Sequence, residues 1–146
     1  MMYLSVAAGA DGIGIYAWDY RRGRGAKPLK GWRTGDSPKD LKILRAAMQE
    51  FTAIQHVLVT PNAESSVTFT NENPAIHVAL KKSDTTTCLV IANDSRGAQK
   101  ATLKLEGIDN TTATNLADGS TLKIMGGVLQ LELAPLESGV YRMEAQ

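Results

Sequence analysis

The chain has 146 residues, of which 43% are hydrophobic, and its formal net charge is +1. This length and composition suit one globular domain, or one domain with an additional arm. The balanced charge argues against a basic nucleic-acid surface, so we expect no nucleic-acid partner. No apolar run is long enough to span a membrane, and we expect no membrane partner. The N-terminus lacks the flank and length of a signal peptide, which leaves a cytoplasmic and a secreted bacterial location both open.

The single cysteine excludes an internal disulfide. Cys88 lies in the apolar run Cys88-Leu89-Val90-Ile91-Ala92. This setting predicts a small buried hydrophobe, since a catalytic thiol needs an activating partner that the sequence does not offer.

The first part of the chain predicts a helix, a turn and a buried strand. Residues 1–8 are expected to form the last turns of a helix, and the segment 9–12 (Gly-Ala-Asp-Gly) suits a tight turn. A continuous apolar run follows. We predict a strand over residues 13–18 that is buried on both faces, as in parallel sheets. The end of this strand carries aromatic and acidic side chains: Trp18, Asp19 and Tyr20.

A long loop, residues 19–36, follows this strand and is rich in Arg, Lys and Gly. Loops of this length are typically functional or mobile. Its basic segment 21–27 suits either contact with a phosphate backbone or a solvated rim around a site. The balanced charge of the chain favours the solvated rim. Trp32 would pack this loop back onto the protein or extend a binding surface.

The next segment predicts the clearest helix of the chain, over residues 37–55. Ser37 is a suitable N-cap, and Pro38 would occupy the first helical position. Apolar residues then recur at helical spacing and define one face. The residues of this face are Leu41, Leu44, Met48, Phe51 and Ile54.

Beyond residue 60 the hydrophobic period changes from 3.6 to 2, and Pro61 and Asn62 break the helical pattern. We therefore divide the chain into residues 1–60 and 61–146. Short runs separated by turn signals predict eight strands, at residues 66–70, 76–82, 87–93, 100–106, 112–115, 121–125, 128–133 and 139–144. This spacing predicts a mainly β chain with an antiparallel β-sandwich of Greek-key type.

Two of these runs alternate cleanly between apolar and polar residues. Ala101, Leu103 and Leu105 share one face of the first run. Leu129, Leu131 and Leu133 share one face of the second. Such alternation predicts strands with one buried face and one face in water.

The segment from Tyr3 to Tyr20 resembles the seventh helix and eighth strand of a glycoside-hydrolase (β/α)8 barrel. In those enzymes an Ala-rich helix often ends in a Gly-Ala-Asp-Gly turn, before a strand of the form Ile-x-Ile/Phe-Tyr-x-Trp. One amphipathic helix and an all-β region then follow, as in retaining glycosidases with a C-terminal β-sandwich. A barrel needs about 250 residues. The chain therefore resembles the last βα unit of such a barrel with its appended domain.

The resemblance implies a longer parent enzyme, of which this chain would be the C-terminal part, and a carbohydrate partner for that enzyme. Trp18 would stack on a sugar ring, with Asp19, Tyr20 and Trp32 as further substrate-binding residues. The two catalytic carboxylates usually lie at the ends of strands four and seven of the barrel, and this sequence contains neither strand. We therefore expect no catalytic residue in this chain, and no catalysis by the chain alone. We also expect no cofactor or metal site, because neither histidine has a Cys, His or Asp cluster around it.

A second hypothesis is a non-catalytic carbohydrate-binding or protein-interaction module, with the β region as the working part. The β region has only two aromatic residues, Phe69 and Tyr141, which is few for a sugar platform. Residues 1–60 would have no closed core by themselves. They predict docking on the sandwich, disorder or association into a homo-oligomer.

Overall fold

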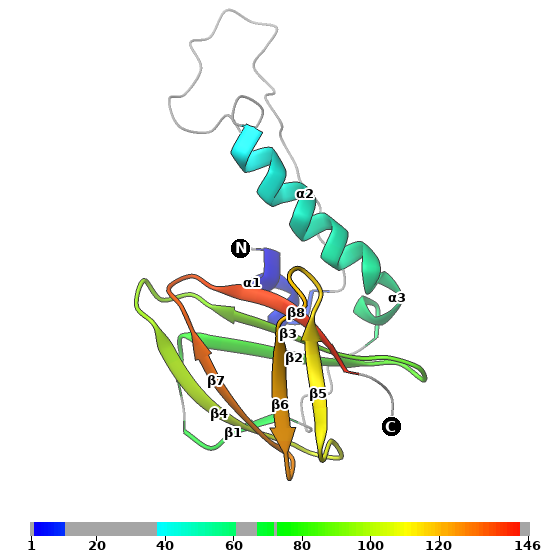
Figure 1. Ribbon diagram of the computed structural model, residues 1–146, viewed down its shortest axis with the longest axis vertical. Coiled ribbons are helices and arrows are strands. Elements are labelled where there is room, and N and C mark those ends of the chain that lie inside the picture. The colour runs from blue at the N-terminus through cyan, green and yellow to red at the C-terminus, as the bar shows by residue number, and fades with distance from the viewer. Residues whose placement is uncertain (1, 11–37, 61–66, 72, 144–146) are drawn as a thin grey trace, which may run out of the picture.

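The computed structural model describes residues 2–10, 38–60, 67–71 and 73–143. Within these ranges the chain forms three helices followed by eight strands (Figure 1). The helices are α1 (Met2–Ala7), α2 (Pro38–Ala53) and α3 (Gln55–Leu58). The strands are β1 (Val67–Phe69), β2 (Ile76–Lys82), β3 (Thr87–Asn93), β4 (Gln99–Leu105), β5 (Thr111–Asn115), β6 (Thr121–Met125), β7 (Val128–Leu133) and β8 (Ser138–Met143). The eight predicted strands are thus confirmed, and no strand end differs from its predicted position by more than one residue.

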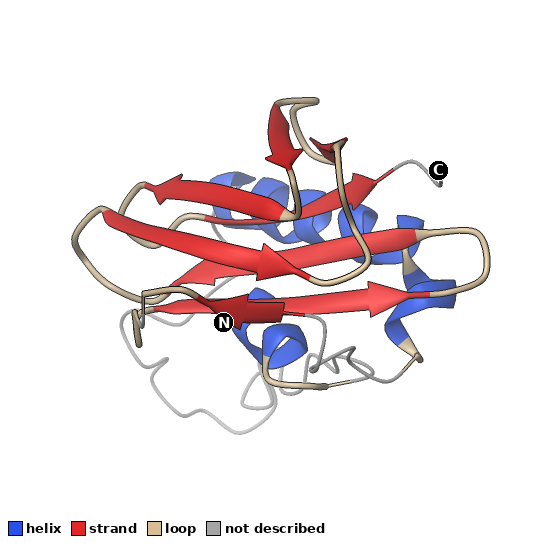
Figure 2. Ribbon diagram, turned by 90° about the horizontal axis from the view of Figure 1, so that it is seen from below, coloured by secondary structure: helices blue, strands red, loops and turns tan. Residues whose placement is uncertain are grey.

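The strands form one antiparallel sheet in the order β1-β4-β7-β6-β5-β8-β3-β2. The sheet curls over itself, so that its strands lie in two facing layers (Figure 2). β5, β6 and β7 are joined as consecutive hairpins, and both β4 and β8 return to lie beside this group. Each return is a Greek-key connection. The predicted mainly β, antiparallel fold is confirmed, and the structure adds that both layers belong to one continuous sheet.

The interior of the curled sheet is filled by alternating apolar side chains. Leu103 and Leu129 face each other across β4 and β7, and both are fully buried. The neighbouring outward residues of the two strands, such as Lys100 and Glu132, are exposed. The prediction of one buried and one wet face is therefore confirmed for β4 and β7.

Two hairpin turns follow from glycines that the sequence places between strands. Gly126 and Gly127 connect β6 to β7 with φ of 56° and 73°, a region that glycine adopts without a steric penalty. A Cβ on Gly127 would lie 3.1 Å from the carbonyl oxygen of Leu105, so this position is also closely packed. Gly119 makes the turn between β5 and β6 with φ of 73°.

The predicted helix over residues 37–55 is present, with two differences. It breaks at Ile54 (φ −116°, ψ 14°), and a short helix, α3, continues the path. The face in contact with the sheet is also rotated from the predicted one. Met48 is 42% exposed, whereas Ala47 and Glu50 are buried beside Phe51. The prediction for Met48 was wrong because the side of α2 that meets the sheet carries Ala47, Glu50, Phe51 and Ile54, and Met48 points away from that side. The N-terminal half of α2 extends away from the sheet (Figure 1).

Candidate functional site, the interface between the helices and the sheet

The outer face of the β2-β3-β8 layer is covered by the helices, unlike the outer face of β4 and β7. Alternate residues of the three strands point outward here, and the helices bring apolar side chains against them. A second buried cluster results, separate from the interior of the sheet. Its buried members are Val6, Phe51, Ile54, Leu58, Ala79, Cys88, Val90 and Val140. Consequently β3 is buried on both faces, with Leu89 and Ile91 in the interior and Val90 under the helices.

Tyr3 and Glu50 join α1 to α2 at the edge of this cluster. The Tyr3 hydroxyl donates a 2.9 Å hydrogen bond to Oε1 of Glu50. The Tyr3 ring also packs on Phe51, with ring centroids 5.1 Å apart. Burial, the hydrogen bond and the charge of Glu50 together raise the pKa of Tyr3 well above its usual range. Oε2 of Glu50 is buried and has no hydrogen-bond partner among the described residues.

Lys81 is a fully buried charged residue on the same face of the sheet. Its Nζ donates hydrogen bonds to the carbonyl oxygens of Leu58, at 3.0 Å, and Thr60, at 2.7 Å. Both carbonyls lie where the chain leaves α3. An ammonium group is stable in such a place only when hydrogen bonds replace its water. Lys81 therefore links the sheet to the end of the helices.

Cys88 is completely buried between its cross-strand neighbours Lys81 and Arg142. Burial raises the pKa of the Cys88 thiol to about 11, although the charge of Arg142 acts in the opposite direction. The thiol is therefore protonated at neutral pH and is a poor nucleophile. This setting agrees with the prediction of a small buried hydrophobe.

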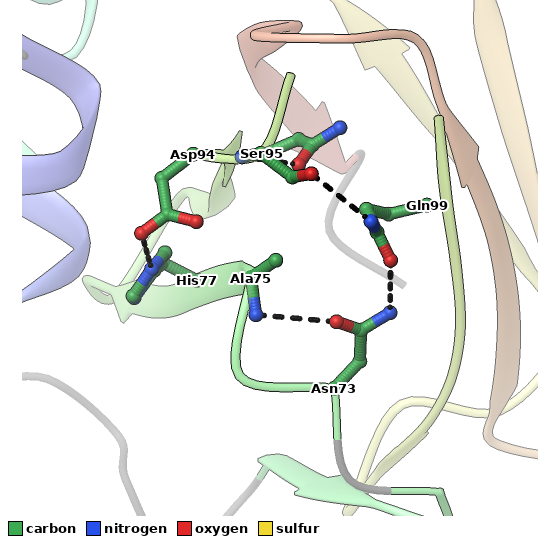
Figure 3. A network of polar contacts seen from close by, with 7 residues as sticks. Asn73, Ala75, His77, Asp94, Ser95 and Gln99 are labelled. Carbon is green, nitrogen blue, oxygen red and sulfur yellow. Dashed lines mark hydrogen bonds and ion pairs between the residues drawn. The ribbon is translucent and has the colours of Figure 1, made fainter. Parts of the chain in front are cut away.

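A polar network lies at one end of the sheet (Figure 3). Asn73, in the connection between β1 and β2, donates a 2.9 Å hydrogen bond to Gln99 on β4. Gln99 in turn donates to Ser95 at 3.2 Å. His77 and Asp94 form a 3.0 Å contact beside them. These side chains hold one another, so the network joins the connection between the two edge strands to the body of the sheet.

The part of the chain that the structure describes offers no exposed aromatic platform. Tyr141 and Phe51 are buried, and Tyr3 and Phe69 are half-buried. In the same residues no three His, Cys, Asp or Glu side chains come together as a metal site would require. No described helix has the length and apolar character needed to cross a membrane.

The substrate-binding residues expected from the sequence, Trp18, Asp19, Tyr20 and Trp32, lie outside the described residues. The predicted strand 13–18 and the loop 19–36 lie outside them as well. The polar residues that the structure brings to the interface, Glu50 and Lys81, were not singled out from the sequence.

A signal for Lys81 was nevertheless present in the sequence. Lys81 lies two residues after Ala79 on β2, so both side chains point to the same, outward face. The apolar face of the predicted helix could be expected to cover this part of the sheet. Glu50 falls on the same side of α2 as Ala47 and Ile54, by helical spacing.

The fold is thus an antiparallel β-sandwich domain that carries helices on one outer face. No family model matches the sequence, and no curated protein matches it. Solved structures do match the fold. An alpha-amylase from Anoxybacillus aligns with a TM-score of 0.59 and 14% identity, over 75% of this chain and 23% of that one.

Two further solved structures are similar. An alpha-amylase from Geobacillus thermoleovorans, solved with acarbose, aligns with a TM-score of 0.57 and 14% identity, over 75% of this chain and 24% of that one. AmyP, solved with maltose, aligns with a TM-score of 0.56 and 17% identity, over 79% of this chain and 23% of that one. At these identities the likeness shows the fold. The chain spans about a quarter of the length of these structures.

Proposed function

We propose that this chain is the C-terminal part of a glycoside hydrolase, with a β-sandwich as an accessory domain and helices that belong to the catalytic barrel. The observation that carries the proposal is the contact between α1, α2 and α3 and the outer face of β2, β3 and β8. A β-sandwich needs no helices to complete its own interior. Helices on its outer face are the arrangement expected where such a domain meets an α/β body.

In this proposal residues 1–60 are the last βα unit of a (β/α)8 barrel, and residues 61–146 are the accessory domain. Trp18 would form the floor of a sugar subsite, and Asp19, Tyr20 and Trp32 would line it. The fold likeness to two alpha-amylases supports a carbohydrate substrate for the parent enzyme. The chain alone would be inactive, because the two carboxylates that cleave a glycosidic bond would come from elsewhere in the barrel.

The test begins with the coding frame upstream of Met1. The chain is then expressed with and without the segment found there, and both proteins are assayed on chromogenic α- and β-glycosides at equal concentration. We expect alternating strands and helices with two carboxylates at strand ends, and hydrolysis by the longer protein alone. An upstream frame without this pattern would overturn the glycosidase origin. Hydrolysis by the chain alone would overturn its inactivity.

A protein-interaction module is the second candidate, and the exposed apolar residues of α2 favour it. Ile43 is 60% exposed and Met48 is 42% exposed on this helix. Through these residues two copies could pair as a homo-oligomer. Light scattering during size-exclusion chromatography measures the mass directly. A dimer that Ile43→Lys converts to a monomer would support self-association, and a monomer at every concentration would oppose it.

A further inference from the structure

Lys81 combines complete burial with a formal charge, and this combination needs a structural reason. Its residue exposure is 0%, whereas the next residue of β2, Lys82, is exposed. A lysine at a boundary between helices and sheet would ordinarily extend its ammonium to water. Removing that group from water is costly unless good hydrogen bonds replace the lost hydration.

Two backbone carbonyls at the C-terminal end of α3 accept hydrogen bonds from Lys81. Nζ lies 3.0 Å from the Leu58 oxygen and 2.7 Å from the Thr60 oxygen. The last carbonyls of a helix have no partner within the helix, and the helix dipole favours a cation at this end. Lys81, on β2, therefore supplies hydrogen-bond donors and a positive charge to the C-terminus of α3.

The two carbonyls lie at the boundary between the helical and the β part of the chain. They lie at residues 58 and 60, where the chain passes from the helices toward β1. A further polar contact between α3 and the β2-β3 hairpin, His56 with Thr86, is 3.5 Å long and exposed. The buried attachment at this point thus combines the apolar contacts of Leu58 with the ammonium of Lys81.

We propose that Lys81 attaches the helices to the sheet at this boundary, so that the helices and the sheet move as one rigid body. Without this contact, mainly apolar contacts would hold the boundary near residue 60. Where the glycosidase origin holds, the same contact would fix the orientation of the accessory domain on the barrel.

Hydrogen exchange measured on the full chain tests whether Lys81 attaches the helices to the sheet. Lys81→Met removes the ammonium and keeps an unbranched side chain, and Lys82→Met is the matched control. In Lys81→Met we expect the amides of Leu58 and Thr60, which donate within this turn, to exchange about 10- to 100-fold faster than in the unaltered protein. The amide of Leu105, hydrogen-bonded to Gly127 across the far layer, should exchange as before.

Three outcomes of this experiment would overturn the proposal. Unchanged exchange at Leu58 and Thr60 would mean that Lys81 holds nothing in place. An equal rise at Leu105 would mean that Lys81 supports the whole fold and has no particular role at the boundary. The same local rise in Lys82→Met would assign the effect to net charge.

A second measurement uses the unaltered protein and holds even where Lys81→Met does not fold. Nitrogen-15 NMR detects lysine ammonium groups whose protons exchange slowly with water. We expect a slowly exchanging resonance from Lys81, because its protons are buried and hydrogen-bonded, and none from Lys82. Rapid exchange at the Lys81 ammonium would show that the group is open to water and would overturn the proposal. Neither experiment depends on hydrolytic activity. A negative result for the role of Lys81 is therefore distinguishable from a negative result for the proposed glycosidase origin.

Discussion

The two outer faces of the sheet have different environments although the strands beneath them share one interior. The outer face of β4 and β7 carries charged and polar residues, among them Lys100 and Glu132, in water. The outer face of β2, β3 and β8 carries Ala79, Val90 and Val140, covered by helices. The outer face of β4 and β7 therefore borders water, whereas the outer face of β2, β3 and β8 supports a further layer of helices.

The largest expected effect comes from placing a charge on the covered face. Val90→Asp would bury a carboxylate without a partner between β3 and the helices, and should lower the free energy of unfolding by about 4 kcal/mol or more. Gln130→Asp, on the wet face of β7, is the control and should change it by about 0.5 kcal/mol or less. Urea denaturation followed by circular dichroism measures both. Similar losses in the two variants would contradict the distinction between the faces.

A cavity in the shared interior should have the next largest effect. Leu129 is fully buried on β7. Leu129→Ala should lower the free energy of unfolding by about 3 kcal/mol, from lost burial and from the cavity left behind. Because both layers enclose this interior, the NMR signals of amides in β3 and of amides in β7 should be lost with the same urea midpoint. Two separate midpoints would indicate that the layers unfold independently.

Removal of the Tyr3 hydroxyl tests the polar contact at the covered face. Tyr3→Phe leaves the buried carboxylate of Glu50 without its hydrogen-bond donor, and should cost about 1–3 kcal/mol. Thermal unfolding measured by calorimetry at neutral pH checks this. Tyr141→Phe, at a buried tyrosine of the interior, shows what loss of a buried hydroxyl costs elsewhere in the sheet.

The same residue predicts a dependence on alkaline pH. The pKa of Tyr3 is raised above its usual value of 10.0 in the folded protein. Its contribution to stability is therefore complete below about pH 10, and is lost as the pH rises further, because the unfolded chain releases this proton first. Stability between pH 9 and 11 should fall more steeply for the unaltered protein than for Tyr3→Phe. Parallel pH profiles would contradict the raised pKa.

The smallest effect is expected for the ion pair on the wet face. Lys100 and Glu132 are 3.1 Å apart, and their side chains are 75% and 68% exposed. Water screens such a pair, so Glu132→Gln should change the free energy of unfolding by about 0–0.5 kcal/mol. A loss above about 1 kcal/mol in urea denaturation at physiological salt would show that this face is less open to water than its residues indicate.

The strands were predictable because their signal is local. Period-two alternation in β4 and β7, and glycines at 119, 126 and 127, specify strands and turns from neighbouring residues alone. The single buried cysteine was predictable for the same reason. Site residues such as Trp18 and Trp32 remain predictions, since they lie outside the described part of the chain.

The sequence by itself determined which segments are strands, where they turn and which side of β4 and β7 is apolar. Tertiary packing alone decided which segments cover the second face of β3, that Met48 faces water while Glu50 does not, and that Lys81 lies under a helix. Local alternation is a property of one strand. The covering of its second face depends on segments that are distant in sequence, and the burial of a charge depends on carbonyl oxygens that those segments bring to it.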